Sequence, residues 1–213
     1  MGAYETLMAT AVVHDALNGS SVGSIQGSAG FTTGGRNGMQ RLLIDSVSVG
    51  QGVSYSSIAY DDEYTIAFMF EPDANAEQNH ICYMDGTIWT HRLSNSGYWF
   101  IQDNGAVIFS STQPTLSTPV SVVIRRDLTS LQLYVNGSLV GQDTSVSTLG
   151  SGSGTLSFGN NNGFGVGQNL LGKLGEFGYF DYKFSDTNMA DYNTGPTSGS
   201  SRRLPAALLG VGL

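Results

Sequence analysis

The sequence predicts an all-β protein, specifically an antiparallel β-sandwich. Charged residues make up 12% of the chain and glycine contributes 29 of its 213 residues, about half the usual charged share and about twice the usual glycine share. Short segments of alternating apolar and polar residues follow one another, with turn residues between them. No helical pattern of crossover length separates these segments, which excludes parallel strand–helix–strand units.

The composition also limits the partners. The net charge is −8, and an acidic surface repels phosphate, so we expect no nucleic acid partner. No stretch approaches the roughly 20 apolar residues of a membrane span. The single cysteine, Cys82, forms no intrachain disulfide, and we expect it to be a small buried apolar residue.

The N-terminal segment, residues 1–20, is predicted to be helical. Apolar residues from Glu5 to Leu17 have a loosely helical spacing, and Asn18-Gly19 supplies a stop signal. Residues 20–38 are rich in glycine and serine and should hold short strands at most.

The sandwich is expected to span residues 21–193. Its clearest strand, "EYTIAFMFEPD", turns Tyr64, Ile66, Phe68 and Phe70 to one face. Other strands are expected at 41–49, 80–85, 87–93, 97–102, 106–111, 119–126, 131–135 and 138–142, with a closing strand through Phe177 and Tyr179 and a short helix capped by Ser185 or Asp186.

The stretch "LYVNGSLVG" predicts a tight hairpin. Asn and Gly tolerate the positive φ angles of a type I′ turn, so the pair at 136–137 sets the register. Val135 should then lie opposite Ser138, and Tyr134 opposite Leu139. A slip of one residue would turn the apolar face of this hairpin to water.

Residues 194–213 differ from the rest in composition. A Gly/Ser-rich linker leads to an apolar arm with a basic collar, and a flexible linker lets such an arm reach a neighbouring chain. We therefore expect protein partners in a large assembly, and a homo-oligomer, although packing of the arm on its own domain stays open. The arm residues that would make this contact are Arg202, Arg203, Leu204, Leu208, Leu209 and Leu213.

The order of these motifs resembles a known family. "EYTIAFMFEPD", "GYWFIQDNG", "PVSVVIRRDLTSLQLYVNGSLVGQ" and "GKLGEFGYFDYKFSDTNMADYN" together are similar to the laminin-G-like jelly roll of the concanavalin-A-like lectin/glucanase superfamily. The resemblance covers about residues 61–193, and the hairpin and the closing strand are its most specific parts. It implies two packed antiparallel sheets, one of them curved.

We expect no cofactor, although the resemblance leaves the binding of calcium as an alternative. Members that bind calcium use acidic and carbonyl oxygens of rim loops, and the candidates here are Asp61, Asp62, Asp85 and Asp103. Calcium needs six to eight oxygens, and no dense oxygen spacing links these four residues. Each is equally typical of a turn.

Aromatic residues suggest a glycan-binding site. Trp89, Tyr83, Tyr98 and Trp99 crowd one region of the sequence, and sugars stack their apolar faces on such rings. The alternative is that these rings pack in the core. Alternation puts Trp99 and Tyr98 on opposite faces of their strand.

No catalytic set is evident, so we expect no enzymatic activity. Retaining glycosidases need two carboxylates about 5–5.5 Å apart. Glu71 and Asp73 flank Pro72, which marks a strand end, and Glu176 and Asp181 differ in parity and so face opposite sides of a regular strand.

Three functions remain open. We expect a non-catalytic interaction protein of a large assembly, such as a phage head decoration or fibre subunit. No signal peptide is recognised, because Glu5 occupies the position of a basic n-region. Such a protein would be made in the cytoplasm and act on the virion surface, the alternative being an extracellular location. A carbohydrate-binding module is the second function, and a glycoside hydrolase is the third.

Overall fold

Strand β6 (Tyr64–Pro72) shows how the alternating pattern builds this fold. Tyr64, Ile66, Phe68 and Phe70 are buried in the main core, as predicted. Ala67, between them, packs in a separate buried cluster on the other face of the strand. The computed structural model describes residues 2–17, 21–33, 40–45, 50–73, 79–84, 89–93, 99–103, 106–110, 112–159 and 171–195.

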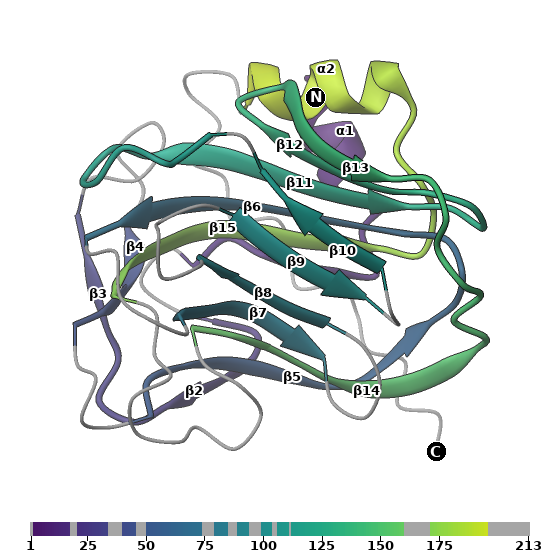
Figure 1. Cartoon of the computed structure of the whole chain (residues 1–213). Coiled ribbons are helices and arrows are strands. Elements are labelled where there is room, and N and C mark those ends of the chain that lie inside the picture. Colours follow the sequence, from purple (N-terminus) through teal and green to yellow (C-terminus); the bar gives the residue numbers. More distant parts are fainter. Residues whose placement is uncertain are drawn as a thin grey trace.

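The described strands form two sheets, in which every pairing is antiparallel (Figure 1). Sheet A has the order β13-β12-β11-β6-β15-β4-β3, with β1 also paired to β15, and sheet B has the order β10-β9-β8-β7-β14-β5-β2. The remaining strands are β1 (Val13–Asp15), β2 (Ser24–Gln26), β3 (Gly30–Thr32), β4 (Arg41–Ile44), β5 (Gly52–Tyr60), β7 (Asn79–Met84), β8 (Trp89–Leu93), β9 (Trp99–Asp103), β10 (Ala106–Phe109), β11 (Val120–Arg126), β12 (Leu131–Val135), β13 (Ser138–Asp143), β14 (Gly152–Phe158) and β15 (Gly172–Phe180).

The main core lies between the sheets. Phe158 from sheet B and Phe177 from sheet A lie with their ring centroids 4.3 Å apart. Tyr55 of sheet B approaches the same Phe177 ring at 5.1 Å. Burying such aromatic side chains supplies the largest apolar contribution to the stability of a sandwich core. The free thiol of Cys82 is buried in the same core, as predicted, and burial raises its pKa.

The predicted hairpin forms with the predicted register. Val135 pairs with Ser138 and Tyr134 with Leu139, and a bulge follows before Leu133 pairs with Gly141. The turn is fixed from β11 as well, because the backbone N–H of Ser121 donates to Asn136 Oδ1 at 2.9 Å. β11, β12 and β13 therefore form the expected meander.

The N-terminal helix is shorter than predicted. α1 ends at Met8 (Ala3–Met8), and Val13–Asp15 forms strand β1 against β15. The backbone N–H of Val12 already donates to the carbonyl of Tyr179 at 2.8 Å. The prediction of a helix from Glu5 to Leu17 was therefore wrong beyond Met8, because the adjacent β-branched Val12 and Val13 favour a strand where β15 offers a free edge.

The C-terminal helix is capped as predicted. α2 (Asp186–Thr194) begins after Ser185, whose hydroxyl accepts from the backbone N–H of Asn188 at 3.1 Å. Asn188 returns the contact through its side chain, which completes a capping box. No helix in the described ranges has the length and apolar character needed to cross a bilayer.

Besides β1, two further strands were not predicted. β5 and β14 pair with each other in sheet B, yet their sequences, "GVSYSSIAY" and "GSGTLSF", are dominated by small and polar residues. The linker from residue 196 and the arm residues Arg202 to Leu213 lie outside the described residues.

Candidate functional site

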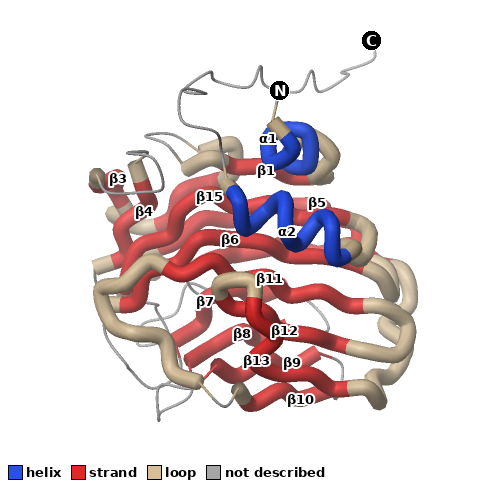
Figure 2. The backbone as a smooth tube through the Cα atoms, turned by 90° about the horizontal axis from the view of Figure 1, so that it is seen from above, coloured by secondary structure: helices blue, strands red, loops and turns tan. Residues whose placement is uncertain are grey.

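The outer face of sheet A is covered near its centre. Both helices lie on the side of this sheet that faces away from sheet B (Figure 1), and Figure 2, which looks down on them, shows β12 and β13 outside their cover. A second apolar cluster joins the helices to the sheet through Tyr4, Leu7, Met8, Ala67, Val123, Phe180, Phe184, Met189 and Tyr192. This apolar filling leaves the middle of the face unavailable to a ligand.

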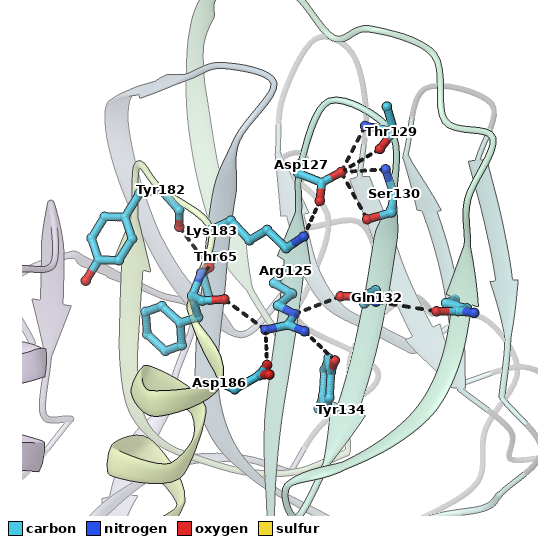
Figure 3. Close-up of polar contacts among 12 residues, drawn as sticks. Thr65, Arg125, Asp127, Thr129, Ser130, Gln132, Tyr134, Tyr182, Lys183 and Asp186 are labelled. Carbon is cyan, nitrogen blue, oxygen red and sulfur yellow. Dashed lines mark hydrogen bonds and ion pairs between the residues drawn. The ribbon is translucent and has the colours of Figure 1, made fainter.

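Arg125 holds the start of α2 against the sheet (Figure 3). Its Nη1 donates to the carbonyl of Phe184 at 2.8 Å and to Asp186 Oδ1 at 3.1 Å. Its Nε donates to Gln132 Oε1 at 2.7 Å, and its Nη2 donates to the Tyr134 hydroxyl at 2.6 Å. The guanidinium thus joins β11, β12 and α2 with its rigid fork of donors.

Asp127 organises the neighbouring turn. It accepts hydrogen bonds from the backbone N–H groups of Thr129 at 2.9 Å and Ser130 at 2.8 Å, and it forms an ion pair with Lys183. Burial opposes ionisation, but the hydrogen bonds from Lys183, Thr129 and Ser130 prevail and hold the pKa of Asp127 well below its usual range. This carboxylate is a structural group that joins β11 to the segment before α2.

The outer face of sheet B carries a polar row. Backbone register aligns Ser54 with Ser157, Ser157 with Tyr83, and, through Thr90 of β8, Tyr83 with Gln102. Their strand neighbours point into the main core, so this row points outward. Tyr83 and Ser54 are half-buried, whereas Gln102 is exposed.

Ser157 stands at the centre of this row and is distinctive. Its side chain is buried, and its Oγ makes no hydrogen bond. Buried hydroxyls without a partner are rare and indicate a group that an ordered water or a ligand completes. A phenol ring beside three polar side chains is the combination of apolar face and directional hydrogen bonding that sugar sites use.

The four aromatic residues predicted to bind a glycan do not lie in one common environment. Tyr83 lies in the polar row, as a surface site requires. Trp99 does not: its side chain is 2% exposed and packs edge-on against Phe70 at a centroid distance of 5.9 Å. Its ring presents no face to a sugar, so Trp99 does not form part of a glycan-binding surface. Trp89 lies in β8 opposite Met84 in backbone register, its side chain being outside the described part, as is all of Tyr98.

Two of the acidic residues predicted as calcium ligands, Asp62 and Asp103, contact the same arginine. Arg126, fully buried, donates to Asp103 Oδ2 at 2.6 Å, and Asp62 Oδ1 lies 3.8 Å from the same guanidinium. The Tyr64 hydroxyl donates to Asp103 Oδ2 at 2.8 Å. Asp103 and Asp62 are therefore counter-ions of Arg126, and a buried cation at that point opposes the binding of another.

Of the other two, Asp61 is exposed and accepts from the backbone N–H of Asp62 at 2.7 Å, as a turn residue does. Asp85 lies outside the described residues. Within the described ranges, no three His, Cys, Asp or Glu side chains gather where they could hold a metal ion.

Two of the carboxylates considered for hydrolysis, Glu71 and Glu176, have side-chain partners from distant segments. Glu71 forms ion pairs with Arg41 and with Lys173, the latter at 2.6 Å. Burial opposes ionisation of Glu71, but the hydrogen bonds from Lys173 and Arg41 outweigh it and lower the pKa of this carboxyl. Glu176 pairs with His14 at 3.0 Å. Sequence reasoning missed these pairs, because nothing local marks partners up to 162 residues apart.

Comparison with known proteins defines the class. A family model described as the Concanavalin A-like lectin/glucanases superfamily matches residues 45–190. The chain therefore belongs to this superfamily, which confirms the resemblance drawn from its motifs. A search of curated protein sequences gave no significant match.

Solved structures share the fold at low identity. Domain 4 of an extracellular arabinanase from Geobacillus stearothermophilus, in complex with arabinotriose, has a TM-score of 0.68 and 12% identity, covering 86% of this chain and 97% of that one. A sialidase from Trypanosoma rangeli has a TM-score of 0.66 and 12% identity, over 87% of this chain and 32% of the sialidase.

The binding domain of Paraclostridial Mosquitocidal Protein 1 has a TM-score of 0.64 and 14% identity, over 87% of this chain and 52% of that one. This chain thus spans about a third of the sialidase and about half of the mosquitocidal chain. At these identities the likeness shows a shared fold.

Proposed function

We propose that this protein is a carbohydrate-binding module whose sugar contact is the polar row of sheet B. The observation that carries the proposal is the arrangement of Tyr83 beside the unpartnered hydroxyl of Ser157, with Ser54 and Gln102 in the same row. A sugar stacks an apolar face on the phenol ring while its hydroxyls bond to the neighbouring side chains.

The comparisons support this class of ligand. The arabinanase domain was solved with arabinotriose, and another similar structure is a putative carbohydrate binding protein from Bacteroides ovatus, with a TM-score of 0.54 and 14% identity. Binding is favoured over hydrolysis because Glu71 and Asp103 are each held by a cation. A proton donor in glycoside cleavage needs a raised pKa, and the pKa of Glu71 is lowered.

A glycan array probed with the full chain tests the proposal. We expect binding to a defined set of glycans, and we expect Tyr83→Ala to weaken the affinity for the best of them by about tenfold or more, since loss of a stacking ring costs about 1.5 kcal/mol beyond its area. Tyr83→Phe, which keeps the ring, should retain most of the affinity. Ser157→Ala should alter the preference among glycans rather than abolish binding.

Two results would refute it. One is an array on which the unmodified protein binds nothing, and the other is an affinity that Tyr83→Ala leaves unchanged. Release of reducing sugar from a bound polysaccharide, lost on substitution of one carboxylate, would instead establish the hydrolase.

The assembly role is a second candidate, favoured by the composition of the arm. The described chain ends on α2, which contacts sheet A, and the arm Arg202 to Leu213 follows a Gly/Ser linker. We propose that the arm joins this domain to a neighbouring copy or to a virion surface. A chain ending at residue 195 should keep the thermal unfolding of the full protein but lose its oligomeric state in ultracentrifugation. An unchanged oligomer would reject the arm as the contact.

A further inference from the structure

A second exposed polar surface lies on sheet A, on the opposite side of the sandwich from Tyr83. Two register rows cross this sheet: Arg125 aligns with Gln132 and Gln142, and Val123 aligns with Tyr134 and Leu139. The helices cover the β15 and β6 side of these rows, whereas β12 and β13 lie outside their cover (Figure 2). We call Gln132, Tyr134, Leu139 and Gln142 the β13 shelf.

Hydrogen bonding gives the shelf a fixed direction. A guanidinium has donors only, so the Arg125 Nε bond of 2.7 Å requires the Gln132 oxygen to face Arg125. The Gln132 NH2 group then faces the other way and donates to Gln142 Oε1 at 3.4 Å. Gln142 is exposed, so the chain of bonds ends with its NH2 group at the edge of the sheet. Figure 3 shows the first bond of this chain, from Arg125 to Gln132.

The ring of the shelf, Tyr134, is held in place by the second apolar cluster, against which it packs, and by Arg125. Arg125 Cζ lies 4.8 Å from the centroid of the Tyr134 ring, and Arg125 Nη2 bonds to the Tyr134 hydroxyl at 2.6 Å. Leu139, opposite Tyr134 on β13, is 46% exposed. A fixed, half-buried ring and an exposed leucine therefore lie next to outward-facing amide donors, which lowers the ordering cost of binding.

The charges around the shelf are compensated within the protein. Arg125 pairs with Asp186 at 3.1 Å, and Lys183 pairs with Asp127. Among the described residues around the shelf, an anionic ligand would find no unpaired cation, and the overall charge of −8 opposes its binding further. The complementary ligand is uncharged, offers oxygen acceptors to the amide donors, and has an apolar face for Tyr134 and Leu139.

We propose that the β13 shelf is a second contact surface for a neutral oligosaccharide, separate from the polar row of sheet B. It goes beyond the proposed function, because it adds a site on the opposite sheet. It does not require the first site to be correct.

Nuclear magnetic resonance of the full chain tests the shelf directly. Uniformly 15N-labelled protein is titrated with five neutral trisaccharides in turn: arabinotriose, xylotriose, cellotriose, maltotriose and mannotriose. We expect at least one to shift the side-chain NH2 resonances of Gln142 and Gln132 saturably. If none of the five shifts them at millimolar concentration, the proposal is overturned.

Two variants distinguish binding at the β13 shelf from a general effect of the sugar on the protein. Gln142→Glu keeps the shape but replaces the NH2 donors by a carboxylate, and it should weaken binding at the shelf by about fivefold to tenfold, the value of one hydrogen bond. Thr144→Ala, at an exposed residue just beyond β13, is the matched control and should leave the affinity unchanged. Equal affinity of Gln142→Glu and the control would also overturn the proposal.

The polar row of sheet B and the β13 shelf can be tested independently of each other. Tyr83→Ala should leave the shifts of the Gln142 resonances intact, and Gln142→Glu should leave the Tyr83-dependent binding intact. If Tyr83→Ala abolishes the Gln142 shifts, the shelf is not a separate site. Gln142 is exposed, so its variant should fold, which an unchanged melting temperature verifies.

Discussion

The guanidinium of Arg126 and the carboxylate of Asp103 meet at 2.6 Å with both side chains 0% exposed. Arg126 belongs to β11 of sheet A and Asp103 to β9 of sheet B, so the ion pair joins the sheets from inside the sandwich. The Tyr64 hydroxyl bonds to the same oxygen at 2.8 Å. Burial and the Asp103 charge together raise the pKa of Tyr64, which keeps this hydroxyl a donor.

Removing one partner of this pair should destabilise the protein strongly. Asp103→Asn removes the nearer counter-ion of buried Arg126 and leaves Asp62, at 3.8 Å, as the remaining one, and we expect a loss of about 3 kcal/mol in the free energy of unfolding. Urea denaturation measures it. The double variant Asp103→Leu with Arg126→Met should lose less than Asp103→Asn, because no buried charge then remains unpaired. A loss below about 1 kcal/mol for Asp103→Asn would contradict the account.

The capping box of α2 gives a smaller effect. Ser185→Ala removes the hydroxyl that accepts from the backbone N–H of Asn188, so we expect a loss of about 1 kcal/mol. Thr187→Ala, at an exposed position in the first turn of the same helix, should stay within about 0.5 kcal/mol of the unmodified protein. Thermal unfolding of the two variants should therefore separate them, and identical melting temperatures would argue against the cap.

The hairpin turn can be tested with two glycines that share a backbone conformation. Gly137 has φ +78° and Gly150 has φ +73°, so alanine is strained at both. A Cβ at Gly137 would lie 2.8 Å from Asn193 Nδ2, whereas nothing lies within 4 Å at Gly150. Asn193 is pinned, because its Nδ2 donates to the carbonyl of Met189 at 2.8 Å.

Gly137→Ala should therefore cost more than Gly150→Ala, by about 1 kcal/mol if one hydrogen bond of Asn193 is lost. Urea denaturation of both variants checks this difference. Equal losses would show that Asn193 moves aside freely and that the turn is not braced by α2.

Stability should fall in acid. Asp127 and Glu71 have lowered pKa values in the folded protein, so folding favours their ionised forms. Their contribution is complete above the unfolded pKa values of about 4, and it is lost as the pH falls toward the folded values. Melting temperatures between pH 7 and pH 2.5 should show this decline. Asp127→Asn should lower the melting temperature at pH 7 and flatten the slope below pH 4, and an unaltered slope would contradict the assignment.

Much of the sheet structure could be read from local pattern. The alternation in β6 and β11 assigns the two faces of each strand, because side chains in a strand have a period of two. The Asn136-Gly137 turn fixes the pairing of its hairpin, because it favours a type I′ turn. β5 and β14 could not be read in this way. Their small and polar residues resemble loop sequence, and they become strands through pairing with β2, β7 and each other.

The candidate site was predictable only in part. Tyr83 was predicted as one of four candidate glycan-binding residues and lies in the outward row, but Trp99 fills the core, since alternation gives two faces without saying which is inside. Asp62 and Asp103 were predicted as candidate calcium ligands, but both lie at the guanidinium of Arg126. The polar rows on both sheets depend on residues from three or more strands.

By itself, the sequence determined the strand faces, the hairpin register, a helix cap at Ser185 or Asp186 and the superfamily, because each depends on residues close together along the chain. The tertiary structure decided the counter-ions, the burial of Trp99, the strand at Val13 and the alignment of Tyr83 with Ser157. These depend on contacts between distant segments, and the energy of such contacts exceeds the weak local preferences of the residues involved.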